Sequence, residues 1–156
     1  MSIATLIAQL RVTEGCEVYP PTDLPANASL PADLKEFYRL AGGAVLFAEA
    51  EYTIEVVPPE QLLRANPLIV GDDHPEDISH EWFVVARAGG QYITIDLSPS
   101  RCGRCYDSFW DSHGVAGSCR VISLSFESLL AQLLQNRGGY WFWLRDDFVD
   151  LGDAYD

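Results

Sequence analysis

The sequence predicts an α+β fold with a mainly antiparallel sheet, and three observations lead to this class. Apolar residues recur at helical spacing near both ends of the chain. The middle of the chain has short apolar runs separated by turns rich in glycine and proline, which is typical of strands. The clearest of these patterns is a hairpin, in which Ala88-Gly89-Gly90 joins the runs at residues 82–86 and 91–97. Helices at both ends with strands between them define an α+β domain.

Three longer helices are expected, each with an apolar stripe that faces the core. Residues 2–11 form the first, and Ser29-Leu30-Pro31 opens the second with a polar cap and a proline in its first turn. Gly42-Gly43 ends the second helix, because glycine reaches the left-handed C-cap conformation without steric cost. Ser125 caps the last helix, and Gly138-Gly139 closes it. The expected buried stripes are Ile3, Leu6, Ile7 and Leu10; Leu34, Phe37, Tyr38 and Ala41; and Phe126, Leu129, Leu130, Leu133 and Leu134.

The expected strands follow from alternation or from continuous apolar sequence. Tyr52–Val56 alternates apolar and polar residues, as a strand with one solvated face does. A short helix from Pro58 through Arg64 follows it. Trp82–Ala86 is almost entirely apolar, which predicts a central strand buried on both faces. Two more strands are expected near residues 105–109 and 120–124. The loop after the first helix should hold no regular element because of its prolines, Pro20, Pro21, Pro25 and Pro31.

Length and composition indicate one domain with its own core. The chain has 156 residues, of which 48% are apolar and 12% aromatic, so it can bury a core without disulfides or metals. We expect a single domain at residues 1–144, followed by an acidic C-terminal tail at residues 145–156. The carboxylates of this tail are Asp146, Asp147, Asp150, Asp153 and Asp156.

The charge balance restricts the partners. Lys and Arg number 10 against 23 Asp and Glu, so the formal charge is −13. Such a surface repels the phosphates of nucleic acids and the anionic surface of a membrane, so neither is expected as a partner. A basic protein is the partner that this field attracts. The charge alone is also explained by solubility.

The sequence predicts a cytoplasmic protein. Residues 1–6 have no basic region ahead of the apolar stretch, and Arg11 interrupts that stretch early, unlike a signal peptide. No apolar run approaches the ~20 residues of a membrane span. In a reducing compartment the cysteines are expected to be free thiols, namely Cys16, Cys102, Cys105 and Cys119.

One cysteine pair has the spacing of a metal or redox motif. Cys102 and Cys105 could hold one zinc ion, with Cys119 and His113 as further ligands. A second pair at this spacing is absent from the sequence, and a redox motif would need a helix N-terminus where the sequence instead predicts a strand. Ordinary thiols are therefore favoured over zinc, and zinc over redox chemistry.

A second group of candidate metal ligands lies in the polar loop at residues 71–81. His74 and His80 stand there among acidic side chains, but such a loop is more often simply solvated. The sequence contains no nucleophile elbow, Walker loop, dinucleotide glycine fingerprint or zinc-protease helix. We expect neither a catalytic residue nor a cofactor.

Four segments together resemble the SUKH superfamily. Residues 30–43 are similar to its signature helix, in which Leu-Pro and an amphipathic helix lead to a Gly-Gly turn. The strand-to-helix passage at 54–62, the hairpin at 82–97 and the helix start at 125–130 follow in the family's order. The similarity covers roughly residues 2–136. It implies helices packed around a twisted sheet.

The resemblance also implies a function in protein binding. The superfamily includes bacterial immunity proteins, which bind and neutralise toxins, often nucleases, and a fungal regulator of cell-wall assembly. A stoichiometric toxin-neutralising protein is the preferred hypothesis. A scaffold or regulatory adaptor is the alternative, and a small zinc or thiol enzyme is favoured less. One fold can host many functions, so no catalytic residues are carried over.

Two regions are candidates for partner contact. Under the immunity hypothesis the acidic loop faces a basic toxin surface and speeds encounter. Its carboxylates are Asp72, Asp73, Glu76, Asp77 and Glu81. In the aromatic run at 140–144, Trp141 and Trp143 are either exposed anchors for a partner or part of a segment that covers the core. The core-covering interpretation is preferred.

Overall fold

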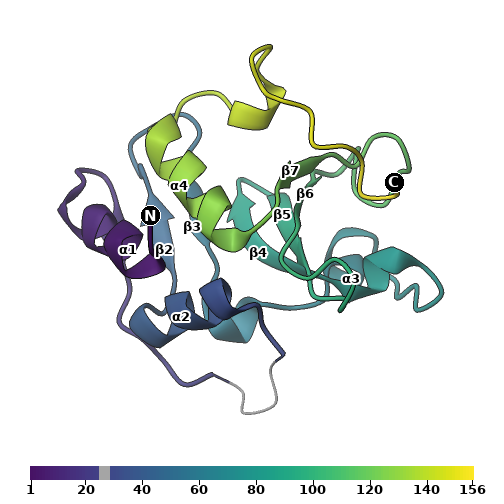
Figure 1. Cartoon of the computed structure of the whole chain (residues 1–156), viewed down its shortest axis with the longest axis horizontal. Helices are drawn as coiled ribbons and strands as arrows, with labels where there is room; N and C mark the ends of the chain where they lie inside the picture. Colours follow the sequence, from purple (N-terminus) through teal and green to yellow (C-terminus); the bar gives the residue numbers. More distant parts are fainter. Residues whose placement is uncertain (25–28) are drawn as a thin grey trace.

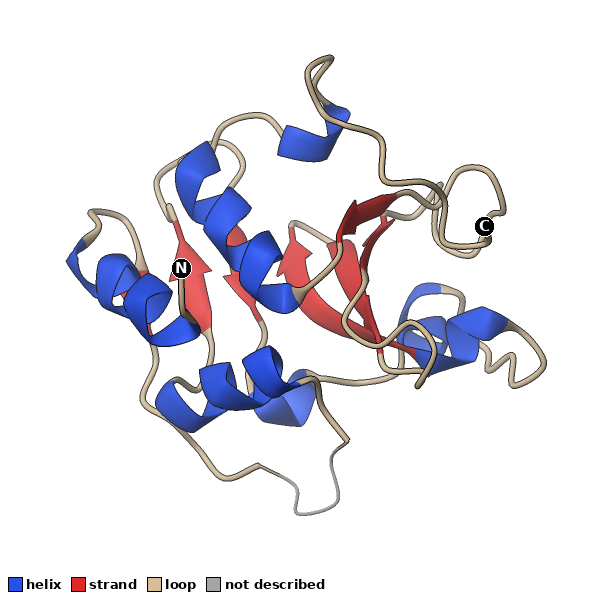
Figure 2. Ribbon diagram, in the orientation of Figure 1, coloured by secondary structure: helices blue, strands red, loops and turns tan. Residues whose placement is uncertain are grey.

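The computed structural model describes residues 1–24 and 29–156, so the expectation for Pro25 lies outside the described residues. Its helices and strands follow the order shown in Figures 1 and 2. The longer helices are α1 (Ile3–Val12), α2 (Ala32–Leu40), α3 (Ala65–Ile69) and α4 (Phe126–Asn136), and the 3-10 turns are η1 (Pro59–Gln61), η2 (Ile78–Glu81) and η3 (Phe142–Leu144). The strands are β1 (Glu17–Val18), β2 (Ala44–Leu46), β3 (Ile54–Val56), β4 (Trp82–Ala88), β5 (Gln91–Asp96), β6 (Cys105–Ser108) and β7 (Val121–Ser123).

The strands of the described residues form one antiparallel sheet in chain order. Each strand pairs with the next one along the chain, from β1 at one edge to β7 at the other. The expected α+β class with a mainly antiparallel sheet is therefore confirmed. The hairpin of β4 and β5 is confirmed as well, with Ala88 paired to Gln91 around the two glycines.

Helices α1, α2 and α4 cover one face of this sheet (Figure 2) and contact one another. Their predicted apolar stripes are buried, except that Leu134 is only half-buried. They form the main core together with one set of strand residues, such as Val85 and Ile95. Since strand side chains alternate between faces, Trp82 and Val84 lie on the opposite face from Val85. They belong to two smaller clusters there.

Five short elements were not expected from the sequence, namely β1, β2, α3, η2 and η3. β1 and β2 have two and three residues, too few for an alternating pattern. β1 also shows that the prediction of no regular element before α2 was wrong, because this strand ends two residues ahead of Pro20. Within the predicted helix from Pro58 through Arg64, only the turn η1 forms. Arg64 forms a β-bridge with Phe83, so the helix α3 begins at the next residue, Ala65.

The ends of α2 differ from the expected caps. The N-cap residue is Pro31, without a side-chain cap bond, so the prediction of a polar cap was wrong. Its first turn is instead joined to that of α4 by Asp33, whose Oδ2 accepts a hydrogen bond of 2.8 Å from the Glu127 backbone N–H. The C-cap is Ala41 in an extended conformation. Gly42 is needed there for space, because a Cβ at this position would lie 2.2 Å from the Pro20 carbonyl oxygen.

We predict that Ser125→Ala lowers the free energy of unfolding by about 1 kcal/mol. The Oγ of Ser125 accepts a hydrogen bond of 3.1 Å from the Ser128 backbone N–H, and this bond would be lost. Ser29→Ala is the matched control and should change stability by less than about 0.5 kcal/mol, because Ser29 does not cap a helix. Urea unfolding of both variants tests this, and equal losses would contradict the assignment of the caps.

Candidate partner-binding surface

The C-terminal segment, residues 140–156, runs from the end of α4 past β7 to the C-terminus (Figure 1). Trp143 is fully buried, and its Nε1–H donates a hydrogen bond of 2.9 Å to Asp107 Oδ2. Trp141 is 8% exposed and stacks on Trp143, with 5.2 Å between the ring centroids. The interpretation of these two tryptophans as exposed anchors is therefore wrong, and the segment covers the core at this point.

The acceptor of that bond, Asp107, joins three parts of the chain. Its side chain is 7% exposed and lies on β6. Its Oδ1 accepts hydrogen bonds of 3.0 Å from the Phe109 backbone N–H and from Ser112 Oγ, while its Oδ2 accepts the bond from Trp143. A buried carboxylate is tolerated when hydrogen bonds satisfy it in this way. Asp107 thus fixes the loop after β6 and the C-terminal segment to the sheet.

The last residues are attached at two further places. Asp153 forms a β-bridge with Arg120, and the adjacent Ala154 is 1% exposed. The Tyr155 hydroxyl donates a hydrogen bond of 2.8 Å to Asp77 Oδ2. The acidic C-terminal residues and the acidic loop at residues 71–81 therefore lie at the same end of the molecule.

The five carboxylates expected in the acidic loop fall into two groups. Asp72, Asp73 and Glu76 are exposed, and the last two lie 3.0 Å and 3.4 Å from the Nδ1 atoms of His80 and His74. The half-buried pair has structural contacts. Asp77 caps η2, and Glu81 Oε1 lies 3.7 Å from Arg64 Nη1. Three of the five are thus exposed to solvent.

Asp77 ends a buried chain of hydrogen bonds that begins at His113. His113 Nε2 lies 2.7 Å from Asn66 Oδ1, and Asn66 Nδ2 donates to Ser79 Oγ, which in turn donates to Asp77 Oδ2. Burial alone raises the pKa of Asp77, but the hydrogen bonds from Ser79 and Tyr155 outweigh it and hold the pKa below its usual range. Burial lowers the pKa of His113 to about 4, against a smaller opposing effect of Asp77. His113 is therefore a neutral structural side chain.

The structure does not bring the expected metal candidates together. Cys105 and Cys119 belong to separate clusters of the core, and Cys102 is exposed. Burial raises the pKa of all three thiols, that of Cys119 to about 12, so they stay protonated at neutral pH. Within residues 1–24 and 29–156, no three His, Cys, Asp or Glu side chains are gathered so that they could hold a metal ion.

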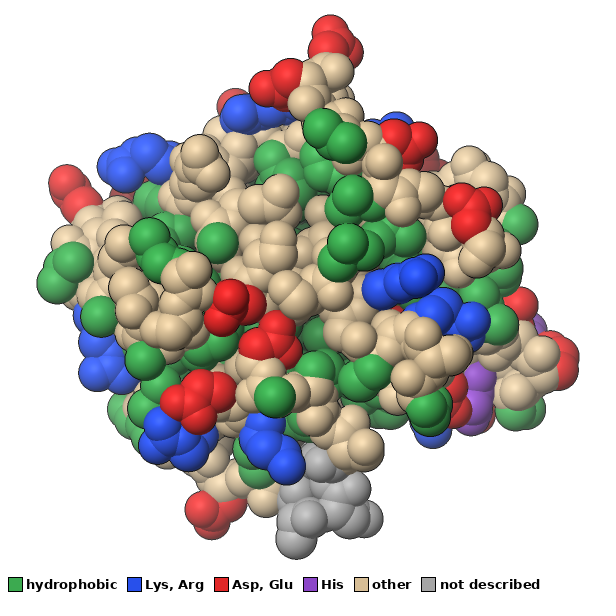
Figure 3. All heavy atoms as spheres, viewed as in Figure 1, with side chains coloured by type: hydrophobic (Ala, Val, Ile, Leu, Met, Phe, Trp, Pro, Cys, Tyr) green, Lys and Arg blue, Asp and Glu red, His purple; other side chains and the backbone are tan. Residues whose placement is uncertain are grey.

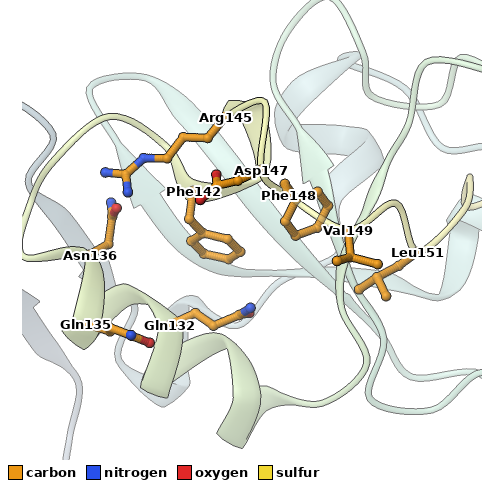
Figure 4. A pocket seen from close by; sticks show the side chains of 9 residues that line it. All are labelled: Gln132, Gln135, Asn136, Phe142, Arg145, Asp147, Phe148, Val149 and Leu151. Carbon is orange, nitrogen blue, oxygen red and sulfur yellow. The ribbon is translucent and has the colours of Figure 1, made fainter.

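Two grooves flank the C-terminal segment. The first has a volume of about 480 Å³ and lies between α4 and this segment (Figure 4). Its lining residues are Gln132, Gln135, Asn136, Phe142, Arg145, Asp147, Phe148, Val149 and Leu151. The second has a volume of about 590 Å³ and lies between this segment and the loop after β6. Its charged lining residues are Asp107, Asp111, Asp150, Asp153, Asp156 and Arg120.

The sequence analysis missed the tryptophan that is exposed at the second groove. Trp110 is 78% exposed, and its neighbours Phe109 and Asp111 both line that groove. Its backbone N–H donates a hydrogen bond of 2.7 Å to Gln91 Oε1, which holds the start of the loop against the β4–β5 hairpin. Its position among polar turn residues, directly after a strand, was the available signal.

Comparison with known proteins identifies the family. The model of the SMI1 / KNR4 family (SUKH-1) matches residues 24–132, more than half of the chain. "Immunity protein YokJ" of Bacillus subtilis (strain 168) is 49% identical to this chain over 160 residues, covering 100% of the chain and 97% of the relative. The chain belongs to the SUKH-1 family. The expected SUKH resemblance is thus confirmed.

The SUKH-1 match leaves out both ends of the chain. It includes strands β2 to β7 and Asp107, but it begins after α1 and β1 and ends at residue 132, before Trp143 and the carboxylates of residues 145–156. The similarity to the immunity protein, in contrast, extends over the whole chain. The described part of the chain contains no helix with the length and apolar character that a membrane crossing requires.

We predict that Trp143→Phe lowers the free energy of unfolding by about 1–3 kcal/mol more than Trp141→Phe. Both variants lose similar volume from the same stack, but only Trp143→Phe leaves Asp107 Oδ2 without its indole donor. Urea unfolding followed by circular dichroism measures both. Equal effects would show that the hydrogen bond to Asp107 does not hold this segment.

We predict that acid destabilises the protein through His113. Its pKa is about 4 in the folded state and about 6.5 when unfolded, so the unfolded chain binds the extra proton between these values. The stabilisation is complete above pH 6.5 and is lost as the pH falls toward 4, by about 3 kcal/mol at most.

Urea unfolding between pH 7 and pH 4 tests this assignment. His113→Gln removes the titrating group and should flatten the dependence of stability on pH, although it lowers stability at pH 7. His74→Gln removes a histidine outside the chain of bonds and should keep the slope of the unaltered protein. If His113→Gln keeps that slope as well, the assignment to His113 is wrong.

Proposed function

We propose that this SUKH-1 protein is an immunity protein that neutralises a cognate protein toxin by stoichiometric binding. The observation that carries the proposal is the 49% identity, end to end, to a protein named for immunity. Neutralisation of this kind needs a complementary surface and no turnover. It therefore requires neither a cofactor nor a catalytic residue in this chain.

The charge distribution supports a basic toxin as the partner. The chain carries a formal charge of −13, and exposed carboxylates from two distant stretches of sequence lie at one end of the fold. Long-range attraction between opposite charges speeds encounter and selects the partner. A nuclease fits this chemistry, because a surface that binds nucleic acid phosphates is basic. We propose that Asp72, Asp73 and Glu76 contribute to this attraction.

The cysteines support action in the cytoplasm. All four are free, and Cys105 and Cys119 are buried in the core as thiols. Free thiols are typical of a reducing compartment. The protein would therefore meet the toxin inside the cell that is to be protected.

We predict that co-expression of this chain protects cells from the toxin domain encoded beside its gene. The two proteins should co-purify at a fixed ratio, and association should slow as salt is raised, because charge contributes to encounter. The triple variant Asp72→Asn, Asp73→Asn, Glu76→Gln should associate several-fold more slowly and should unfold at the same urea concentration. Continued killing without co-purification would refute the proposal, and capture of several endogenous partners instead would favour an adaptor.

A further inference from the structure

The apolar side chains at the C-terminal segment are unusually exposed for a chain that buries most of its large ones. Leu144, Val149 and Leu151 are 39%, 76% and 37% exposed, all within eight residues. On the face shown in Figure 3, apolar side chains gather over α4 and this segment. Trp110, whose neighbours Phe109 and Asp111 line the second groove, is 78% exposed. Concentrated exposure of this kind marks a surface that another molecule covers.

The first groove on the same face is lined by aromatic rings and amide side chains. Figure 4 shows Phe142 near Gln132, with Arg145 at the Asn136 end of the groove. The oxygens Gln132 Oε1 and Asn136 Oδ1 are closed off from solvent, so they are not contacts for a partner in this conformation. The rings of Phe142 and Phe148 make the groove suited to an apolar side chain of a partner.

The second groove attracts cations. Five carboxylates and one guanidinium line it, and none of the ion pairs formed by the described residues includes them. The guanidinium is that of Arg120, which already donates to the Trp143 carbonyl oxygen and lies 5.9 Å from the Phe148 ring. Asp111 takes part in no hydrogen bond or ion pair with the described residues. Asp107 is buried and satisfied by its own donors, so the charge that lysine and arginine side chains can meet comes from Asp111 and the three C-terminal carboxylates.

The segment between the grooves is held in place before any partner arrives. Trp143 is bonded to Asp107, Asp153 is bridged to Arg120, and Tyr155 is bonded to Asp77. Three acidic side chains also stabilise local turns, since Asp150, Asp153 and Asp156 each accept a backbone N–H. A pre-formed surface loses less conformational entropy on binding than a free tail does.

We infer that this face, defined as α4, Trp110 and residues 142–156, binds the toxin directly. The inference rests on the proposed immunity function and names the partner's contact chemistry. The occupant is a basic segment of the toxin that places an apolar side chain in the first groove and lysine or arginine in the second. The exposed loop at residues 72–76 contributes attraction at longer range but is not the main contact.

The test measures binding of the toxin domain encoded beside the gene to the full chain and its variants. Trp110→Ala removes an aromatic contact, and Val149→Lys places a cation in the first groove. Each should weaken binding about 10-fold or more. Asp111→Lys should mainly slow association, whereas Trp110→Ala should mainly speed dissociation. All three side chains are exposed, so unfolding midpoints should stay unchanged.

Val12→Lys and Glu60→Lys are the matched controls. Val12 is 85% exposed at the end of α1, on the other side of the molecule from the C-terminus (Figure 1), and Glu60 is exposed on η1. Both should bind within about 2-fold of the unaltered chain. If the unaltered chain neutralises the toxin but the three face variants bind like the controls, this inference is overturned and the proposed function stands. If the unaltered chain does not bind, both are overturned.

Discussion

The arrangement of the C-terminal half depends on one buried carboxylate. Asp107 is 7% exposed and accepts hydrogen bonds from its own loop and from the indole of Trp143, 36 residues further along the chain. A buried carboxylate must be satisfied, and among the described residues Oδ2 has only the indole of Trp143 as donor, so losing that donor leaves a desolvated oxygen without a hydrogen bond. This requirement couples the loop after β6 to the C-terminal segment. The two sides of the second groove are consequently fixed relative to each other.

Charged and apolar side chains contribute differently to binding at the surface formed by the C-terminal segment and its two grooves. Exposed carboxylates act over about a Debye length and set the rate and the choice of partner. Apolar side chains such as Trp110 and Val149 act only at contact and set the lifetime of a complex. Several carboxylates at the second groove also stabilise backbone turns, as Asp153 does for Gly117 and Tyr155. The acidic side chains thus stabilise local turns and also create the negative electrostatic field of this surface.

The parts that the sequence predicts well are those whose pattern lies within one segment. The helical stripes and the hairpin around Gly89-Gly90 need only their own periodicity, and they are where the sequence places them. β1 and β2 are too short for such a pattern, and β1 forms only by pairing with β2, which lies beyond α2 in the chain. The contact of Trp143 could not be predicted for the same reason, because nothing near it indicates that its acceptor is on β6. The polar turn residues around Trp110, in contrast, were a local signal of its exposure. The spacing of Cys102 and Cys105 suggests zinc, but Cys105 and Cys119 are in separate core clusters.

The boundary of the SUKH-1 match separates the sheet from the C-terminal segment, and this bears on which partner the protein can recognise. The match contains Asp107 and most of the loop-bearing sheet, whereas Trp143 and the exposed apolar residues follow it. The part of the fold inside the match therefore supplies the acceptor, Asp107, and the C-terminal segment supplies the donor, Trp143. The residues between Trp143 and Tyr155 are held at both ends by hydrogen bonds, which fix the position of the backbone between them. These bonds do not depend on which exposed side chains the intervening residues carry. A segment attached in this way can change the partner that it recognises while the sheet and its core stay the same.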